Sequence, residues 1–115
     1  MESDKKMRDA EFVRDQEWAI YHKSVAEAQE WALSNNVIIH YTFFIDQVRA
    51  PSEVFVFYKK DEDVAIYEEN GVTEKIKSFF YSNFEGYKKE GITIIIDSDE
   101  NVQNNYEGSY FFRFR

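Results

Sequence analysis

The side chains most suited to chemistry in this sequence are its two histidines, His22 and His40, and its many carboxylates. The histidines lack the spacing of four residues on a helix that a zinc-binding pair uses. No serine-nucleophile motif is present, and the few glycines are too scattered for a phosphate-binding loop. Asp97 and Asp99 could contact a hard cation, but two carboxylates fall short of the six or more oxygen ligands that Ca²⁺ prefers. The sequence therefore predicts no catalytic residue, no metal site and no cofactor.

The carboxylates gather instead in two clusters, and these are where we expect a partner to bind. The formal net charge of −8 opposes binding to a phosphate backbone, because such binding depends on Lys and Arg. It suits a basic protein partner, with neighbouring tyrosines as aromatic anchors. The candidate partner-binding residues are Asp61, Glu62, Asp63, Tyr67, Glu68, Glu69, Asp97, Asp99, Glu100 and Tyr106. The alternative is that both clusters are solvated turns that keep the protein soluble.

Length and composition predict one globular domain over residues 1–115, with residues 1–8 frayed. Hydrophobic residues make up 43% of the chain and aromatic ones 18%, so the core should be aromatic. Cysteine is absent, which fits a reducing compartment. No run approaches the roughly 18 apolar residues of a membrane span, and no signal peptide is evident. We therefore expect a cytoplasmic protein with no membrane partner.

Two stretches have the period of an amphipathic helix. In residues 9–33 apolar side chains recur at spacings of three and four, and residues 34–36 are of types that end a helix. In residues 73–89 the same spacing follows Thr73, a suitable N-cap, and Gly91 comes just after the pattern ends. We expect both helices to pack on a sheet.

Five other runs have strand-like patterns, separated by turns or polar loops. The predicted strands are residues 37–45, 53–60, 64–67, 92–97 and 106–115. The run 53–60 carries bulky apolar residues on both faces, so it should be covered on both sides. The predicted fold class is α+β, with a mostly antiparallel five-stranded sheet, two helices and the element order α-β-β-β-α-β-β.

Aromatic residues on these strands could in principle stack on nucleic-acid bases. The basic groove that such binding needs is missing, so we expect no nucleic-acid partner. An exposed aromatic face would instead indicate an interface, and a second copy of the chain is one candidate to cover it.

Several runs, taken in order, resemble the YezG-like immunity proteins. Trp31 precedes the first predicted strand, and three further runs follow it. These are Glu53-Val54-Phe55-Val56-Phe57-Tyr58, Ile76-Lys77-Ser78-Phe79-Phe80 and Ile92-Thr93-Ile94-Ile95-Ile96. The resemblance covers roughly residues 31–114, and this chain is shorter, with nothing after its last run. It implies a small acidic protein that neutralises a bacterial polymorphic or contact-dependent-inhibition toxin.

The resemblance further implies a non-catalytic inhibitor that binds a toxin domain, often a nuclease, inside the producing cell. Two other functions stay open. An acidic surface would equally serve a nucleic-acid mimic that inhibits a phage-defence nuclease. A small enzyme or ligand carrier could instead use His40 and a sheet face.

Overall fold

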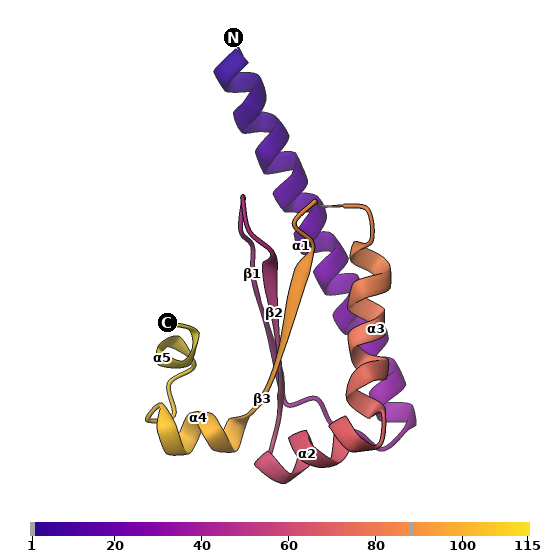
Figure 1. Ribbon diagram of the computed structural model, residues 1–115. Helices are drawn as coiled ribbons and strands as arrows, with labels where there is room; N and C mark the ends of the chain where they lie inside the picture. The colour runs from indigo at the N-terminus through magenta and orange to yellow at the C-terminus, as the bar shows by residue number, and fades with distance from the viewer. Residues whose placement is uncertain (1, 88) are drawn as a thin grey trace.

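The computed structural model describes the backbone of residues 2–87 and 89–115 and the side chains of residues 14–87 and 89–115. Within these residues the chain forms five helices and one three-stranded sheet (Figure 1). The elements are α1 (Glu2–Ser34), β1 (Tyr41–Ile45), β2 (Ser52–Tyr58), α2 (Asp61–Glu69), α3 (Val72–Phe84), β3 (Ile92–Ser98), α4 (Asp99–Asn105) and α5 (Tyr110–Phe114). The class α+β is confirmed, but the predicted five-stranded sheet with two helices is wrong.

The sheet has β2 at its centre and mixes the two strand directions. β1 runs antiparallel to β2, with Tyr41 opposite Phe57. β3 runs parallel to β2, with Tyr58 opposite Ser98, so the sheet is not mostly antiparallel as predicted. Parallel neighbours need a long crossover, which α2 and α3 supply. The carboxyl ends of β2 and β3 therefore lie next to each other.

The predicted strand 64–67 is wrong because its residues belong to α2. Three carboxylates occupy the first turn of this helix, where the helix dipole favours negative charge. The carboxylate of Asp63 also accepts a hydrogen bond from the Lys60 backbone N–H at 3.3 Å. The acidic run of residues 61–63 is therefore the first turn of a helix and not a solvated turn.

The predicted strand 106–115 is also wrong, and the polar connection before it contains the helix α4. Ser98 is the N-cap of α4, and its Oγ accepts a hydrogen bond from the Asn101 N–H at 3.0 Å. Ser109 is the N-cap of α5, and its Oγ accepts a hydrogen bond from the Phe112 N–H at 3.2 Å. Phe114 then lies one turn beyond Tyr110, so the aromatic alternation that suggested a strand is followed by a helix instead.

The two predicted helices exist, with different limits. α1 begins at Glu2, so residues 2–8, which we expected to be frayed, are helical, and Met1 lies outside the described residues. α3 ends at Phe84, and Gly86 follows with a positive φ of 81°. Residues 85–87 and 89 are therefore not part of the helix, and Lys88 lies outside the described residues. The N-cap of α3 is Gly71, so the predicted cap Thr73 lies inside the first turn and is buried.

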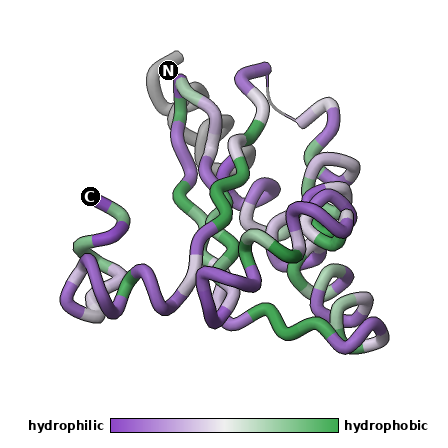
Figure 2. The backbone as a smooth tube through the Cα atoms, turned by 60° about the horizontal axis from the view of Figure 1, so that its bottom comes forward, coloured by the Kyte–Doolittle hydropathy of each residue, from purple (hydrophilic) through white to green (hydrophobic). Residues whose placement is uncertain are grey.

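Both faces of β2 are covered, as predicted. Val54, Val56 and Tyr58 point into the main core, which α1 and α3 close from one side of the sheet. Phe55 and Phe57 point to the other side, where they pack in a second cluster with side chains of α4 and α5. Figure 2 shows the hydrophobic residues concentrated along the strands. The sheet therefore separates a large core from a small one.

Candidate partner-binding surface

The two acidic clusters meet at one end of the sheet, because they follow the neighbouring carboxyl ends of β2 and β3. The Ser98 hydroxyl hydrogen-bonds the Asp61 carboxylate. The Asp61 backbone N–H donates to Glu100 Oε1 at 3.1 Å, and the Glu100 N–H donates to the Lys59 carbonyl at 3.0 Å. The structure thus joins Asp61 and Glu100, which are far apart in sequence, through contacts within the protein.

Asp97 faces the protein interior rather than solvent. Its Oδ2 lies 2.5 Å from Nε of Arg113 on α5. The amide of Asn101 donates to both of its oxygens, at 3.0 and 2.9 Å. The Arg113 guanidinium also lies 5.6 Å from the Phe55 ring centroid. Asp97 therefore holds the second aromatic cluster to the sheet.

Asp99 is the more buried carboxylate, with 6% of its surface exposed. Its Oδ1 accepts a hydrogen bond from the Tyr110 hydroxyl at 2.7 Å, and its Oδ2 one from Lys59 Nζ at 3.2 Å. Gln103 donates to Oδ1 at 3.3 Å, and His40 Nε2 lies 3.5 Å from the same oxygen. These donors use most of the lone pairs that one carboxylate offers.

Hydrogen bonding sets the ionisation of this pair. The bond from Tyr110, with smaller contributions from Gln103 and Lys59, lowers the pKa of Asp99 against the opposing effect of burial. Burial, followed by the bond to Asp99 and its negative charge, raises the pKa of Tyr110. An ionised Asp99 therefore accepts hydrogen bonds from a neutral tyrosine, a lysine and a glutamine, and His40 lies close to the same carboxylate.

The two tyrosines suggested as partner anchors contact the protein itself. Tyr67 meets Tyr58 edge to face, with ring centroids 4.9 Å apart. The Arg113 guanidinium lies 5.6 Å from the Tyr106 ring centroid. Both rings are half-buried, so little of either is free for a partner.

The outward face of α2 presents a different set of side chains. Glu62, Ala65, Ile66 and Glu69 lie at helical spacings on one stripe and are all exposed. We call these four residues the α2 stripe. Ile66, at its centre, keeps 50% of its surface exposed. Sequence reasoning found the two glutamates but not Ile66, because the run was read as a strand.

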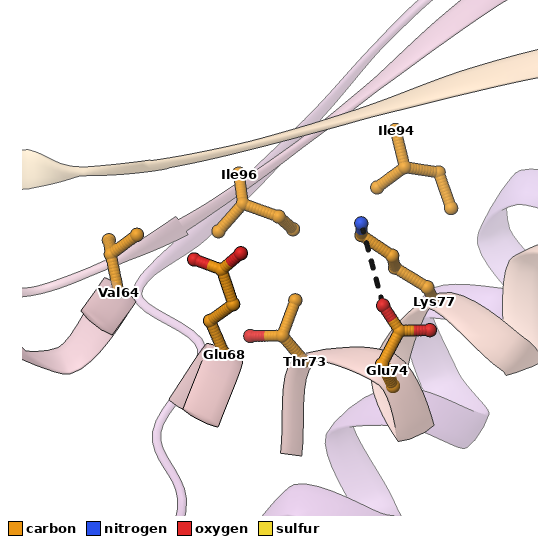
Figure 3. Close-up of a pocket in the computed structure, with 7 residues that line it drawn as sticks. All are labelled: Val64, Glu68, Thr73, Glu74, Lys77, Ile94 and Ile96. Atoms are coloured by element: carbon orange, nitrogen blue, oxygen red, sulfur yellow. Dashed lines mark ion pairs between the residues drawn. The ribbon is translucent and has the colours of Figure 1, made fainter. Parts of the chain in front are cut away.

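A pocket of about 230 Å³ lies between α2, α3 and β3 (Figure 3). We call it the α2–α3 pocket. Its lining residues are Val64, Glu68, Thr73, Glu74, Lys77, Ile94 and Ile96. Figure 3 shows the Glu68 carboxylate on one side and the Lys77 ammonium on the other, with the two isoleucines along β3. Of these residues, only Glu68 was among the predicted site residues.

Comparison of the chain with protein-family models, with curated proteins and with solved structures finds no significant match in any of the three. None of the helices within the described residues is long and apolar enough to cross a membrane.

Proposed function

We propose that this protein is a non-catalytic inhibitor that binds a basic protein partner through the α2 stripe. The observation that carries the proposal is the composition of that exposed face. Ile66 lies between Glu62 and Glu69, one helical turn away on either side, and half of its surface is exposed. An aliphatic anchor with a charged rim is the pattern of a protein interface.

Charge complementarity indicates the kind of partner. Residues 61–74 contain six carboxylates and no Lys or Arg. Such a segment attracts a basic surface and raises the rate of encounter with it. A nuclease must carry a basic surface to hold phosphates, so a nuclease domain is a suitable partner. The resemblance to the YezG-like immunity proteins supports a bacterial toxin as that nuclease.

The contacts between the inner side of α2 and the main core hold this helix in a fixed position, which favours binding without rearrangement. Val64 and Tyr67, on its inner side, pack against the main core. The Tyr58 hydroxyl, under this helix, forms a 2.7 Å hydrogen bond with Thr73 at the start of α3. A surface fixed in this way loses little conformational entropy on binding.

Asp97 and Asp99 have no part in this proposal, because their carboxylates bind Arg113, Asn101, Tyr110 and Lys59. Their role is to fix α4 and α5 to the sheet. The proposed surface is therefore narrower than the set of acidic residues that the sequence suggested.

Isothermal titration with the toxin domain encoded by the neighbouring gene tests the proposal. We expect binding at low salt that weakens as salt increases. The double variant Glu62→Lys/Glu69→Lys should weaken binding at least about tenfold, because it places like charges against the basic partner. Glu90→Lys, at an exposed position in the turn before β3, is the matched control and should bind as the wild type does. Equal effects of these variants, or no binding at low salt, would contradict the proposal.

A further inference from the structure

We infer that the α2–α3 pocket receives an arginine side chain of the basic partner. The inference rests on the proposed function and assigns one contact within it. Glu68, on the wall of the pocket, points about 100° around α2 from Glu69 on the α2 stripe. A partner must therefore extend around α2 from the stripe to reach the pocket.

The size of the pocket favours a single side chain. Its volume of about 230 Å³ lies below the roughly 300–1,000 Å³ typical of small-molecule sites. It is lined by three separate elements, whose inner residues belong to or pack against the main core. A space of this volume can hold one side chain but is small for a drug-sized metabolite.

The floor of the pocket is apolar. Ile94 and Ile96 project from β3 toward the helices, and Val64 of α2 adds a third aliphatic side chain (Figure 3). The hydroxyl of Thr73 is already hydrogen-bonded to Tyr58 at 2.7 Å. The methylene stem of a long cationic side chain can therefore pack on this floor while its charged end stays near the rim.

The rim carries an excess of negative charge. Glu68 and Glu74 contribute two carboxylates, and Lys77 contributes one ammonium. The Lys77–Glu74 pair is long, at 3.9 Å, and 79% of the Glu74 side chain is exposed. Among the described residues, Glu68 has neither an ion pair nor a side-chain hydrogen bond. The rim can therefore accept one more positive charge without breaking a strong contact.

The shape of the guest cation distinguishes arginine from lysine. Glu68 and Glu74 come from different helices and stand on the same pocket, so a planar group with several N–H donors can bond both. The ammonium of a partner lysine would lie near the ammonium of Lys77, and it has fewer N–H donors than a guanidinium for the two carboxylates. We therefore expect arginine to bind more tightly than lysine.

The test uses the intact protein and a blocked tripeptide, acetyl-Gly-Arg-Gly-amide, followed by NMR of the isoleucine methyl groups. We expect saturable shifts of the Ile94 and Ile96 methyls in the millimolar range, with the methyl of Ile38, an exposed residue before β1, unmoved. The citrulline tripeptide keeps the shape of arginine without its charge and should bind at least about fivefold more weakly. The lysine tripeptide should fall between the two.

Glu68→Gln and Glu74→Gln should each weaken binding of the arginine peptide several-fold, whereas Glu90→Gln, at an exposed position in the turn before β3, should leave that binding unchanged. Unaltered methyl spectra of the free variants will show that each still folds. Equal binding of the arginine and citrulline peptides, or an equal effect of all three variants, would overturn the inference. Lysine binding more tightly than arginine would overturn it as well.

These results are separable from those on the proposed function. Peptide binding in the pocket without any binding of the toxin domain would remove the proposed function and leave a cation pocket. Toxin binding that is sensitive to Glu62→Lys/Glu69→Lys, without peptide binding in the pocket, would remove the pocket inference alone.

Discussion

Glu62 and Glu69 of α2 resemble Asp97 and Asp99 in sequence, but the two pairs of carboxylates have different surroundings in the structure. Asp97 and Asp99 turn inward and bind Arg113 and Tyr110, which arrive from α5. Glu62 and Glu69 turn outward on a helix that holds no basic residue. Asp61, in the same run as Glu62, is hydrogen-bonded by Ser98, so an acidic side chain stays available at the surface only where no other segment contacts it.

The largest effect is expected from removing Asp99, the more buried of the two inward carboxylates. Asp99→Ala leaves the Tyr110 hydroxyl and the Lys59 ammonium without their acceptor. We expect the free energy of unfolding to fall by about 2 kcal/mol, since a buried polar group loses its partner while Lys59 stays largely solvated. Urea denaturation followed by tryptophan fluorescence measures the change. A loss below about 0.5 kcal/mol would show that this carboxylate is no more structural than those of α2.

Asp97→Asn tests the same region with a smaller perturbation. The substitution keeps one oxygen for Asn101 but removes the charge that faces Arg113. We expect a loss of about 1 kcal/mol, because both side chains of this pair are mostly buried but not fully so. Chemical denaturation beside Glu100→Gln, a neighbouring carboxylate at the start of α4, provides the comparison. Equal losses in the two variants would argue against a special role for the Arg113 pair.

The ionisation of Asp99 and Tyr110 should make the stability of the protein depend on pH. The pKa of Asp99 is lower in the folded state than in the unfolded state. Its contribution to stability is therefore fully present above the ordinary pKa of an aspartate, about 4. That contribution is lost as the pH falls through the lowered pKa. The raised pKa of Tyr110 works in the opposite sense, with a contribution full below about 10 and lost as the pH rises above that value.

We therefore expect Asp99→Asn to flatten the acid side of the stability profile and Tyr110→Phe to flatten the alkaline side. Denaturation midpoints between pH 3 and pH 11 measure both. Retention of the full acid slope in Asp99→Asn would assign acid sensitivity to other carboxylates.

Much of the main core followed from the sequence, and much of the second cluster did not. The helical period of α3 placed Ile76, Phe80 and Phe84 on one face, and all three are buried. The two-sided apolar run of β2 was also interpreted correctly. Long periodic stretches of this kind are where local pattern and tertiary packing agree.

The incorrect predictions concern short runs whose apolar pattern fits both the period of a helix and that of a strand. Val64–Tyr67 is too short to separate a strand from a helix, although its three preceding carboxylates were a usable sign of a helix start. Tyr110–Phe114 alternates like a strand, but Ser109 caps it as a helix. The Arg113–Asp97 contact could not be inferred, because it exists only when α4 and α5 turn the chain back onto the sheet.

The smallest expected effect belongs to the α2 stripe. Glu62→Gln/Glu69→Gln removes two exposed charges that contact no cation on their own helix. We expect the free energy of unfolding to change by less than about 0.5 kcal/mol, since exposed positions of this kind contribute little to stability. Thermal denaturation measures it against Asp99→Ala. A loss comparable with that of Asp99→Ala would show that Glu62 and Glu69 make stabilising contacts within the protein, as Asp99 does.

The parallel pairing of β2 with β3 also determines the order in which the sheet can fold. Ile45 and Glu53 meet across a short hairpin, whereas Tyr58 reaches Ser98 only after α2 and α3 have intervened. Closing the longer loop costs more chain entropy, so the hairpin should form early and the third strand late. Refolding should therefore pass through a stage in which β3 has not yet paired with β2 and its isoleucines are exposed. The rate at which β3 then pairs will govern how readily the chain aggregates at high concentration.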